Sequence, residues 1–359
     1  MALALAFGRR GMGKVSPWPS VGCVIVKDGR VVGRGRSDKL AGHHAEVGAL
    51  NMAGDQAMGA TAYVTLEPCS HQGSTPPCAE ALISAGIARV VSAIEDPNPL
   101  VCGSGHAKLK AAGIEVTTGV MASDATKDHA GFLSVQTLDR PMLTLKLAAS
   151  IDGRIATASG ESKWITGPDA RKMVHLLRYQ HDAVLVGAGT ARADDPELNV
   201  RGYGDVPQPV RIVASKNLDL PLDCKLVKSA QNSPVWLVHD AGVSAEAFEN
   251  AGAVSVPVAV GADRRLAPLA MLSEFAKLGL TRVFCEGGGT FAASLLQANV
   301  VDRLVVFHAG MGIGAEGTPA LGAMGLDSLG DAVRFDLADT VQIGQDVMST
   351  WLRREDTSP

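Results

Sequence analysis

The feature that most constrains this chain is a set of three potential metal ligands in its first quarter. His44 and Glu46 form a His-Ala-Glu triplet, Cys69 follows a proline, and Cys78 follows a Pro-Pro pair. One imidazole and two thiolates make a tetrahedral zinc site with one open position, which a catalytic zinc needs. The fold must therefore bring three separate segments to one point.

Glu46 lies next to a predicted ligand without being one, and we predict that it carries protons. Zinc lowers the pKa of bound water to about 7, so hydroxide is available at neutral pH to attack an amidine-like carbon. Glu46 can take the proton of that water and return it to the departing amine. We expect Cys78 in the first turn of a helix that opens at Pro76-Pro77, where a helix N-terminus favours the thiolate.

The spacing of the cysteines separates this chain from most nucleobase deaminases. Those enzymes carry H-x-E followed by P-C-x-x-C, whereas eight residues separate Cys69 from Cys78 here. The run TLEPCSHQGSTPPCAEAL (65–82) resembles the deaminase half of the bifunctional riboflavin-biosynthesis proteins, and residues 96–116 are similar to the next block of that family. The resemblance implies a cytidine-deaminase-like, three-layer α/β domain.

Taken one at a time, these residues have simpler interpretations. A His-Ala-Glu triplet is common, and two cysteines nine positions apart could be buried thiols or, in another compartment, a disulfide. The order of the motifs, with prolines before both cysteines, favours the metal site. His43 and His71 are neighbours of the motifs, and we expect His71 to be a loop or substrate-contact residue because the ligand set is already complete.

Length and alternating strand and helix signals predict two α/β domains. A chain of 359 residues exceeds one typical core. We expect a zinc-dependent deaminase domain at residues 1–138 and a second domain at 139–359, joined by a short, partly helical connection between Gly119 and Pro141. Asp28-Gly29 predicts an antiparallel hairpin in the first domain. Cys23 and Cys285 lie in apolar runs and are predicted to be buried.

Composition argues against a nucleic-acid-binding, secreted or membrane protein. The net charge is −4, so nothing indicates a general nucleic-acid footprint. The opening run MALALAF lacks a basic segment before it and is better explained as the start of an amphipathic helix than as a signal peptide. No apolar stretch reaches the ~18 residues of a membrane span. We expect a cytoplasmic protein with no membrane partner.

The second half resembles the reductase domain of the same family. The matching blocks are residues 143–178, ARADDPELNVR (191–201) and CEGGGT (285–290). The resemblance implies a dihydrofolate-reductase-like fold that uses NADPH. On their own terms, Gly287–Gly289 could let a phosphate approach a helix N-terminus or could form a tight turn. Lys146, inside an apolar strand, needs a partner or a function; either it pairs with Glu286, or both line a substrate pocket.

The family's site residues carry over by position. Lys146 and Glu46 are the predicted catalytic residues. The predicted substrate contacts are Ser162, Arg178, Leu198, Arg201 and Glu286, in which Arg178 and Arg201 could hold a phosphate bidentately. The predicted NADPH contacts are Ala148, Trp164, Thr190, Asp194, Ser215, Gly288, Gly289 and Thr290, and Ser215 lies in a segment one residue shorter than the family pattern.

Three positions on the substrate side of the deaminase site depart from the family. Trp18 replaces an Asn, Ser37 replaces a His or bulkier residue, and Ser74 replaces a Lys or Arg. An indole cannot make the contacts of an amide, although Trp18 could stack on a base. These changes affect substrate recognition and leave the predicted zinc ligands intact.

The functional prediction is a two-step enzyme that acts on a small phosphorylated aminopyrimidine. Zinc hydroxide deaminates 2,5-diamino-6-ribosylamino-4(3H)-pyrimidinone 5′-phosphate, and NADPH then reduces the ribosyl chain to ribityl. A paralogue with a degenerate or shifted deaminase site is the alternative. An RNA-editing deaminase is a third class, disfavoured by the negative charge and the dinucleotide-type second domain. The resemblance also implies a homo-oligomer, a dimer or tetramer.

Overall fold

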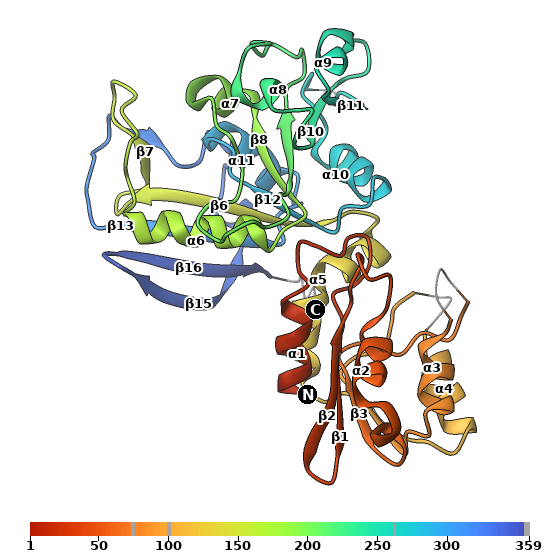
Figure 1. The fold of residues 1–359 in the computed structure, drawn as a ribbon. Helices are drawn as coiled ribbons and strands as arrows, with labels where there is room; N and C mark the ends of the chain where they lie inside the picture. Colours follow the sequence, from red (N-terminus) through yellow and green to blue (C-terminus); the bar gives the residue numbers. More distant parts are fainter. Residues whose placement is uncertain (73–75, 99–101, 262, 355–359) are drawn as a thin grey trace. The chain divides into compact units, whose positions relative to one another are not determined.

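The computed structural model describes residues 1–72, 76–98, 102–261 and 263–354. Ser74 lies outside the described residues. The chain divides into two compact units, Met1–Asp139 and Arg140–Pro359 (Figure 1). In the part of the chain that is described, no helix is long and apolar enough to cross a membrane.

The first unit is built on a five-stranded mixed sheet in the order β2-β1-β3-β4-β5. Asp28 and Gly29 both have positive φ, as the predicted hairpin turn requires, and the antiparallel pairing of β1 with β2 confirms that prediction. β3, β4 and β5 run parallel. The strands are β1 (Gly22–Lys27), β2 (Arg30–Arg36), β3 (Thr61–Val64), β4 (Arg89–Ser92) and β5 (Glu115–Thr117).

Helices cover both faces of this sheet. A Cβ on Gly35 would lie 2.1 Å from the carbonyl of Ala45, and one on Gly22 would lie 1.9 Å from that of Ala4, so two helices approach the sheet closely from opposite sides. The expected helical start of the chain is present. The helices are α1 (Ala2–Arg9), α2 (Ala45–Ala53), η1 (Gly54–Ala57), α3 (Cys78–Ser84), α4 (Ser104–Ala111) and α5 (Ala122–Leu138).

The second unit contains a nine-stranded sheet in the order β11-β10-β9-β8-β12-β6-β13-β16-β15. Its first seven strands pair in parallel, and β16 and β15 continue it antiparallel. The strands are β6 (Met142–Ser150), β8 (Ala183–Gly187), β9 (Val210–Ala214), β10 (Val235–Asp240), β11 (Val254–Val258), β12 (Arg282–Cys285), β13 (Arg303–Ala309), β15 (Phe335–Ile343) and β16 (Asp346–Arg353). A separate pair joins β7 (Arg154–Ala156) to β14 (Thr318–Pro319).

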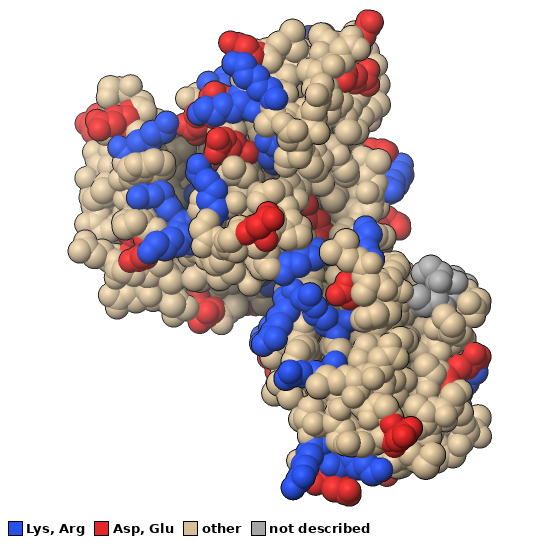
Figure 2. All heavy atoms as spheres, viewed as in Figure 1, with Lys and Arg blue, Asp and Glu red and all other residues tan. Residues whose placement is uncertain are grey.

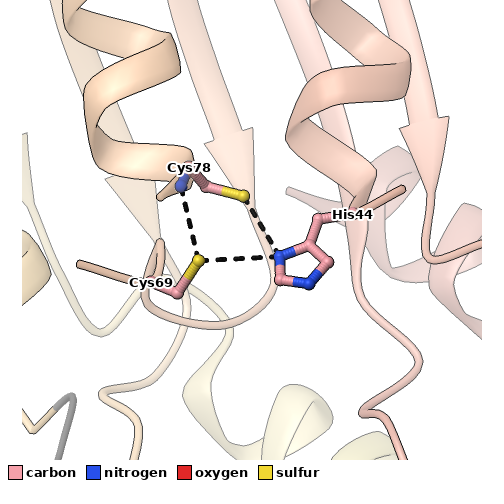
Figure 3. Close-up of side chains that lie close together, drawn as sticks. All are labelled: His44, Cys69 and Cys78. Carbon is pink, nitrogen blue, oxygen red and sulfur yellow. Dashed lines mark hydrogen bonds between the residues drawn. The ribbon is translucent and has the colours of Figure 1, made fainter. Parts of the chain in front are cut away.

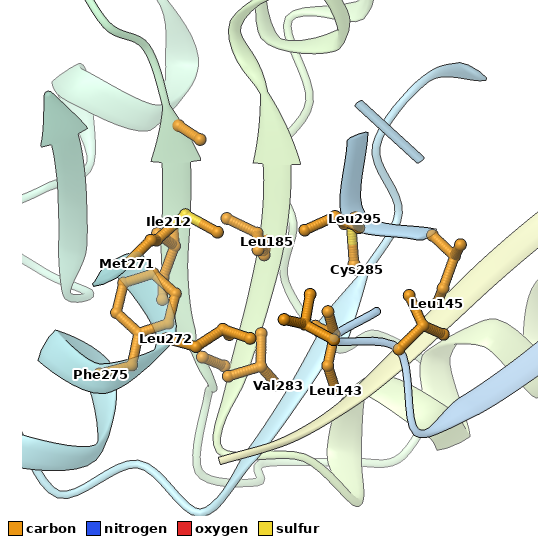
Figure 4. Packing of buried hydrophobic residues seen from close by; sticks show 14 of the residues in the cluster. Leu143, Leu145, Leu185, Ile212, Met271, Leu272, Phe275, Val283, Cys285 and Leu295 are labelled. Carbon is orange, nitrogen blue, oxygen red and sulfur yellow. The ribbon is translucent and has the colours of Figure 1, made fainter. Parts of the chain in front are cut away.

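The core of the second unit lies between this sheet and its helices. Leu143, Leu185 and Ile212 from three strands of the sheet pack with Phe275 and Leu295 from two helices, and all are fully buried (Figure 4). Cys23 and Cys285 are buried as predicted. The helices are α6 (Pro168–Tyr179), α7 (Ala188–Asp194), α8 (Lys225–Lys228), α9 (Glu246–Asn250), α10 (Pro268–Lys277), α11 (Gly289–Gln297) and η2 (Leu329–Asp331).

Candidate metal centre and cofactor cavity

The three predicted metal ligands meet at one point in the first unit (Figure 3). His44 is the N-cap of α2, Cys69 follows β3, and Cys78 is the first residue of α3. Nδ1 of His44 lies 3.2 Å from Sγ of Cys78 and 3.6 Å from Sγ of Cys69. All three ligand atoms lie within 4.8 Å of one another.

This donor set fits zinc. With Zn–N and Zn–S bonds of about 2.0 and 2.3 Å, tetrahedral geometry places nitrogen and sulfur about 3.6 Å apart, close to the spacings of His44 from the two thiols. The backbone N–H of Cys78 also donates to Sγ of Cys69 (3.3 Å). Hydrogen bonds from Cys78, then from His44, lower the pKa of Cys69 to about 4. The site is therefore ready to present a thiolate.

Glu46 is the second residue of α2 and is buried, with 3% of its surface exposed. Burial, and then the negative charge of Cys69, raise the pKa of Glu46 to about 7. A carboxyl group with a pKa close to neutral can both accept and release a proton at physiological pH. The structure thus places a suitable proton carrier beside the three ligands.

Glu67 is a residue of this region that the motif analysis did not single out. Its carboxylate accepts backbone N–H groups from Asp96 (3.2 Å), Gly103 (2.9 Å), Gly105 (2.8 Å) and His106 (3.2 Å). Its buried carboxylate thus holds the start of α4 beside the segment between β3 and Cys69. Glu67 also groups with His106 and an exposed glutamate, but these backbone donors already occupy both of its oxygens.

Two of the residues that depart from the family pattern, Trp18 and Ser37, lie near the metal centre. The indole of Trp18 meets the imidazole of His44 edge to face, with ring centroids 5.6 Å apart. Ser37 is 5% exposed, and its hydroxyl donates to the carbonyl of Pro19 (2.8 Å) and accepts the N–H of Val21 (3.0 Å). Ser37 therefore holds the segment that carries Trp18 and has little capacity left for a substrate.

The second unit contains a cavity of about 1190 Å³ at the carboxyl ends of its parallel strands. Lys146 and Ala148, both on β6, line it. The other predicted reductase residues that line it are Ser162, Trp164, Arg178, Thr190, Asp194, Leu198, Arg201, Glu286, Gly288, Gly289 and Thr290. Figure 2 shows Lys and Arg side chains around a hollow in this unit.

Ser215 is the exception among the predicted cofactor contacts. Its neighbours Ala214 and Lys216 line the cavity, whereas Ser215 is 1% exposed and is not one of the lining residues. Its hydroxyl donates to Oδ1 of Asp219 (2.9 Å). The Ser215 side chain is therefore turned into the protein, consistent with the shortened segment in which it lies.

Glu286 pairs with Arg178 rather than with Lys146. Nε and Nη2 of Arg178 donate to the two carboxylate oxygens at 2.6 and 3.1 Å, and Nη1 donates to the carbonyl of Asn199 (2.8 Å). The expectation of Arg178 as a bidentate phosphate clamp does not fit this arrangement, because its fork is already used. Arg201 is 63% exposed at its side chain and pairs with Glu197 at 3.0 Å.

Burial lowers the pKa of Lys146, and the nearby Glu286 carboxylate opposes that shift. Burial also acts on Glu286, but Arg178 outweighs it, and the pKa of Glu286 is lowered overall. Around Lys146 the cavity therefore holds the carboxylate of Glu286, which is paired with Arg178, and the proton of Lys146 is held less tightly than usual. Such a lysine can act as a proton donor.

Packing alone requires glycines in the triplet at 287–289. A Cβ on Gly287 would lie 2.6 Å from Phe291, and one on Gly289 would lie 2.9 Å from the carbonyl of Pro319. Gly288 is the N-cap of α11, and its N–H donates to Oγ1 of Thr190 (3.0 Å). The open backbone at the start of this nine-residue helix faces the cavity, so the residues present fit the phosphates of a dinucleotide.

Among the lining residues that were not predicted are two side chains of α6 that can form polar or cationic contacts. His175 and Arg171 both lie on α6 and line the cavity. The Arg171 guanidinium stacks 4.5 Å above the ring of Trp164. Nδ1 of His175 lies 3.1 Å from the carbonyl of Asn199. Their spacing of four along one helix was the available signal, because it places both on one face.

The two sites define a class of protein: a zinc-type deaminase unit followed by a unit that binds a dinucleotide. Residues 1–94 match the cytidine and deoxycytidylate deaminase zinc-binding region, and residues 141–349 match the RibD C-terminal domain. The chain is 42% identical to the riboflavin biosynthesis protein RibD of Escherichia coli and 40% identical to that of Aquifex aeolicus; each match covers 97% of this chain and 96% of the relative.

Solved structures agree with these sequence relatives. RibD of Acinetobacter baumannii has a TM-score of 0.88 at 37% identity, covering 99% of this chain and 98% of that one. A deaminase/reductase from Thermotoga maritima has a TM-score of 0.87 at 30% identity, covering 99% and 97%. The chain belongs to the RibD family of riboflavin biosynthesis proteins. It is a bifunctional enzyme, with a zinc-binding deaminase domain of cytidine-deaminase type and an NADPH-dependent, dihydrofolate-reductase-like domain.

Proposed function

We propose that this chain deaminates 2,5-diamino-6-ribosylamino-4(3H)-pyrimidinone 5′-phosphate and then reduces the ribosyl group of the product to ribityl. The Thermotoga maritima relative is described as a diaminohydroxyphosphoribosylaminopyrimidine deaminase and 5-amino-6-(5-phosphoribosylamino)uracil reductase. The observation that carries the proposal is the convergence of His44, Cys69 and Cys78 beside the buried Glu46. We assign residues 1–138 to deamination and 139–359 to reduction.

In the deaminase unit, the three ligands would hold zinc, which supplies Lewis acidity and lowers the pKa of water when bound. Glu46 takes one proton from the attacking water and delivers it to the amine that leaves as ammonia. Its pKa of about 7 suits both steps. Its burial keeps bulk water from competing for that proton.

In the reductase unit, the cavity residues would hold NADPH, which would supply the hydride that reduces C1′ of the ribosyl group. The bond from C1′ to the ring oxygen breaks, and that oxygen needs a proton. Lys146 can donate it, because burial lowers the pKa of Lys146. Arg178 holds Glu286 in a fixed orientation, so that the carboxylate can position the sugar hydroxyls.

Separate assays of the two half-reactions test this proposal. Zinc-loaded protein should release ammonia from the diaminopyrimidine, and it should oxidise NADPH, followed at 340 nm, when given the deaminated intermediate. Absence of NADPH oxidation with that intermediate contradicts the reductase assignment. Absence of ammonia from protein with full zinc content contradicts the substrate assigned to the deaminase.

A second candidate function is a deaminase with a shifted substrate, and the edge-on contact of Trp18 with His44 favours it. An aromatic wall beside the metal would stack on a pyrimidine or on a related ring without the amide contacts of an asparagine. Trp18→Asn should then raise kcat/KM for the diaminopyrimidine phosphate. Trp18→Phe serves as the control, because it keeps the aromatic face, and equal activities of Trp18→Asn and the parent protein would contradict the shift.

Family membership is also the basis for proposing a cytoplasmic homo-oligomer that acts without nucleic acid. Light scattering coupled to gel filtration tests the oligomeric state. A binding assay with labelled RNA at physiological salt tests whether the protein binds nucleic acid. We expect no binding, because the net charge is −4.

A further inference from the structure

The order of the strands determines how a dinucleotide can lie in the cavity of the second unit. β12 pairs in parallel with β8, and β8 pairs in parallel with β9. Their carboxyl ends therefore lie side by side, and ligands of parallel α/β sheets bind across such ends. Gly287–Thr290 follow β12, Ala188–Thr190 follow β8, and Lys216 lies just beyond β9; all of these segments line the cavity.

The order of the strands also predicts which end of the dinucleotide lies over which strand. The start of α11, after β12, is the place for a pyrophosphate, and Lys146 on β6 marks the reacting end on one side of it. The adenosine half must then extend the other way, across β8 toward β9. In doubly wound folds, the residues near the end of this next strand recognise the adenosine ribose: a carboxylate binds the 2′-hydroxyl of NAD, and a basic residue accepts the 2′-phosphate of NADP.

The cavity carries positive charge at this end. Besides Lys216, the side chains of Arg264 and Arg265 line it. Both arginines lie on a tight turn closed by a bridge between Val260 and Leu266 and by the N–H of Gly261, which donates to the carbonyl of Arg265 (2.7 Å). Three cationic side chains from two loops thus face one end of the cavity.

The carboxylates near this end are already engaged. Asp219 accepts the Ser215 hydroxyl and pairs with Arg192 at 2.6 Å, and Asp195 pairs with Lys225 at 3.8 Å. Within the described residues, no carboxylate forms an ion pair with Lys216 or with either arginine of the turn. Asp240, at the end of β10, and Asp263 accept the backbone N–H groups of Gly242 and Arg265 and do not line the cavity. Lys216 and the two arginines of the turn therefore supply the cavity-lining charge beyond β9, which suits a phosphate.

We propose that Lys216, assisted by Arg264 and Arg265, binds the 2′-phosphate of NADPH and sets the preference for NADPH over NADH. The inference rests on the proposed function, in which this cavity binds NADPH. It assigns to Lys216 the contact that Ser215 cannot make here, because the Ser215 hydroxyl is bound to Asp219.

Calorimetric titration with adenosine 2′,5′-bisphosphate and with AMP tests the proposal without turnover. The full-length protein should bind the bisphosphate more tightly than AMP. Lys216→Ala should weaken binding of the bisphosphate about tenfold, the size of one charge-assisted hydrogen bond, and leave AMP unchanged. Lys216→Arg should retain most of the preference. Lys228→Ala is the matched control, since Lys228 is exposed on α8 and does not line the cavity.

Steady-state oxidation of NADPH and NADH provides the second measurement. Lys216→Ala should lower kcat/KM for NADPH about tenfold relative to NADH, and Arg265→Ala should lower it less. Equal losses for both nucleotides, or an unchanged bisphosphate-to-AMP ratio, overturn the proposal. A parent protein that binds the bisphosphate in preference to AMP but oxidises neither nucleotide would overturn the proposed reductase function and leave this inference standing.

Discussion

The two sites of this enzyme are built in opposite ways. The metal centre is small: three ligand atoms within 4.8 Å, supplied by residues that begin α2, follow β3 and begin α3. The reductase site is a cavity of about 1190 Å³ whose wall includes residues from β6, α6 and α11 and from the loops between them. One site depends on a few atoms in a fixed geometry, and the other on the shape and charge of a large surface.

This difference predicts different responses to mutation. A metal centre fails completely when one donor is lost, because no neighbour can replace a thiolate. A broad cavity loses one contact at a time, so its activity should decline in steps. The predictions below test that contrast, from the largest expected effect to the smallest.

Loss of one ligand should abolish deamination and spare reduction. Cys69→Ala removes the thiolate with the lowered pKa, and we expect zinc content and ammonia release to fall to background. NADPH oxidation with the deaminated intermediate should persist. Metal analysis and the two half-assays measure this, with the exposed Cys102→Ala as the control. Equal loss of both activities would show that the sites do not respond independently.

Removing the proton carrier should stop the chemistry and leave the metal in place. Glu46→Gln keeps the size of the side chain but cannot take a proton, so we expect ammonia release to fall about 10²–10⁴-fold. Zinc content, measured on the same sample, should be unchanged. Full-rate ammonia release from this variant would refute the role of Glu46.

Breaking the ion pair of the cavity should destabilise the second unit. Arg178→Ala leaves the Glu286 carboxylate largely buried without its guanidinium, and we expect the free energy of unfolding to fall by about 3 kcal/mol. Urea unfolding, followed by tryptophan fluorescence, measures the change. Lys277→Ala breaks an exposed pair with Glu274 and should cost less than about 1 kcal/mol. Similar costs for both variants would contradict the prediction.

The smallest effect concerns pH and the buried His181. Burial, and then the charge of Arg282, lower the pKa of His181 to about 3, whereas the unfolded chain binds that proton near pH 6.5. Below pH 6.5 the unfolded chain takes up a proton that the folded protein does not bind. The free energy of unfolding is therefore highest above pH 6.5 and decreases as the pH falls toward 3. Between pH 7.5 and 5.5 the loss should be on the order of 1 kcal/mol.

His181→Gln removes the titrating group, so the unfolding free energy of this variant should depend less on pH over that range than that of the parent protein. His308→Gln is the control, because His308 is exposed on β13. If both variants keep the pH dependence of the parent, the buried imidazole is not its source.

The contrast between the compact metal centre and the broad cavity also explains which features the sequence could predict. Both cysteines of the metal centre follow a local signal, a proline before Cys69 and Pro-Pro before Cys78. The prediction of a zinc-binding deaminase domain is confirmed by the match of residues 1–94. The hairpin at Asp28-Gly29 and the helix that begins at Cys78 follow from equally local rules.

What the sequence could not show depends on contacts between distant segments. The pairing of Arg178 with Glu286 joins residues 108 positions apart, and no local pattern distinguishes it from a pairing with Lys146. Ser215 has the correct residue type, but the hydrogen bond to Asp219 turns it away from the cavity. The terminal hairpin of β15 and β16 was also not predicted, although the alternation of Phe335, Leu337, Val341 and Ile343 along β15 was an available strand signal.

Glu67 has a consequence for engineering this enzyme. One carboxylate, two positions before a metal ligand, binds the backbone of Asp96 and of the first residues of α4, and Gly105 is too close to the carbonyl of Pro68 to accept any side chain. The two segments therefore form a single exchangeable module. A loop transplanted from a relative into residues 96–106 must bring a compatible partner for residues 67–69, or the graft will distort the metal centre that it adjoins.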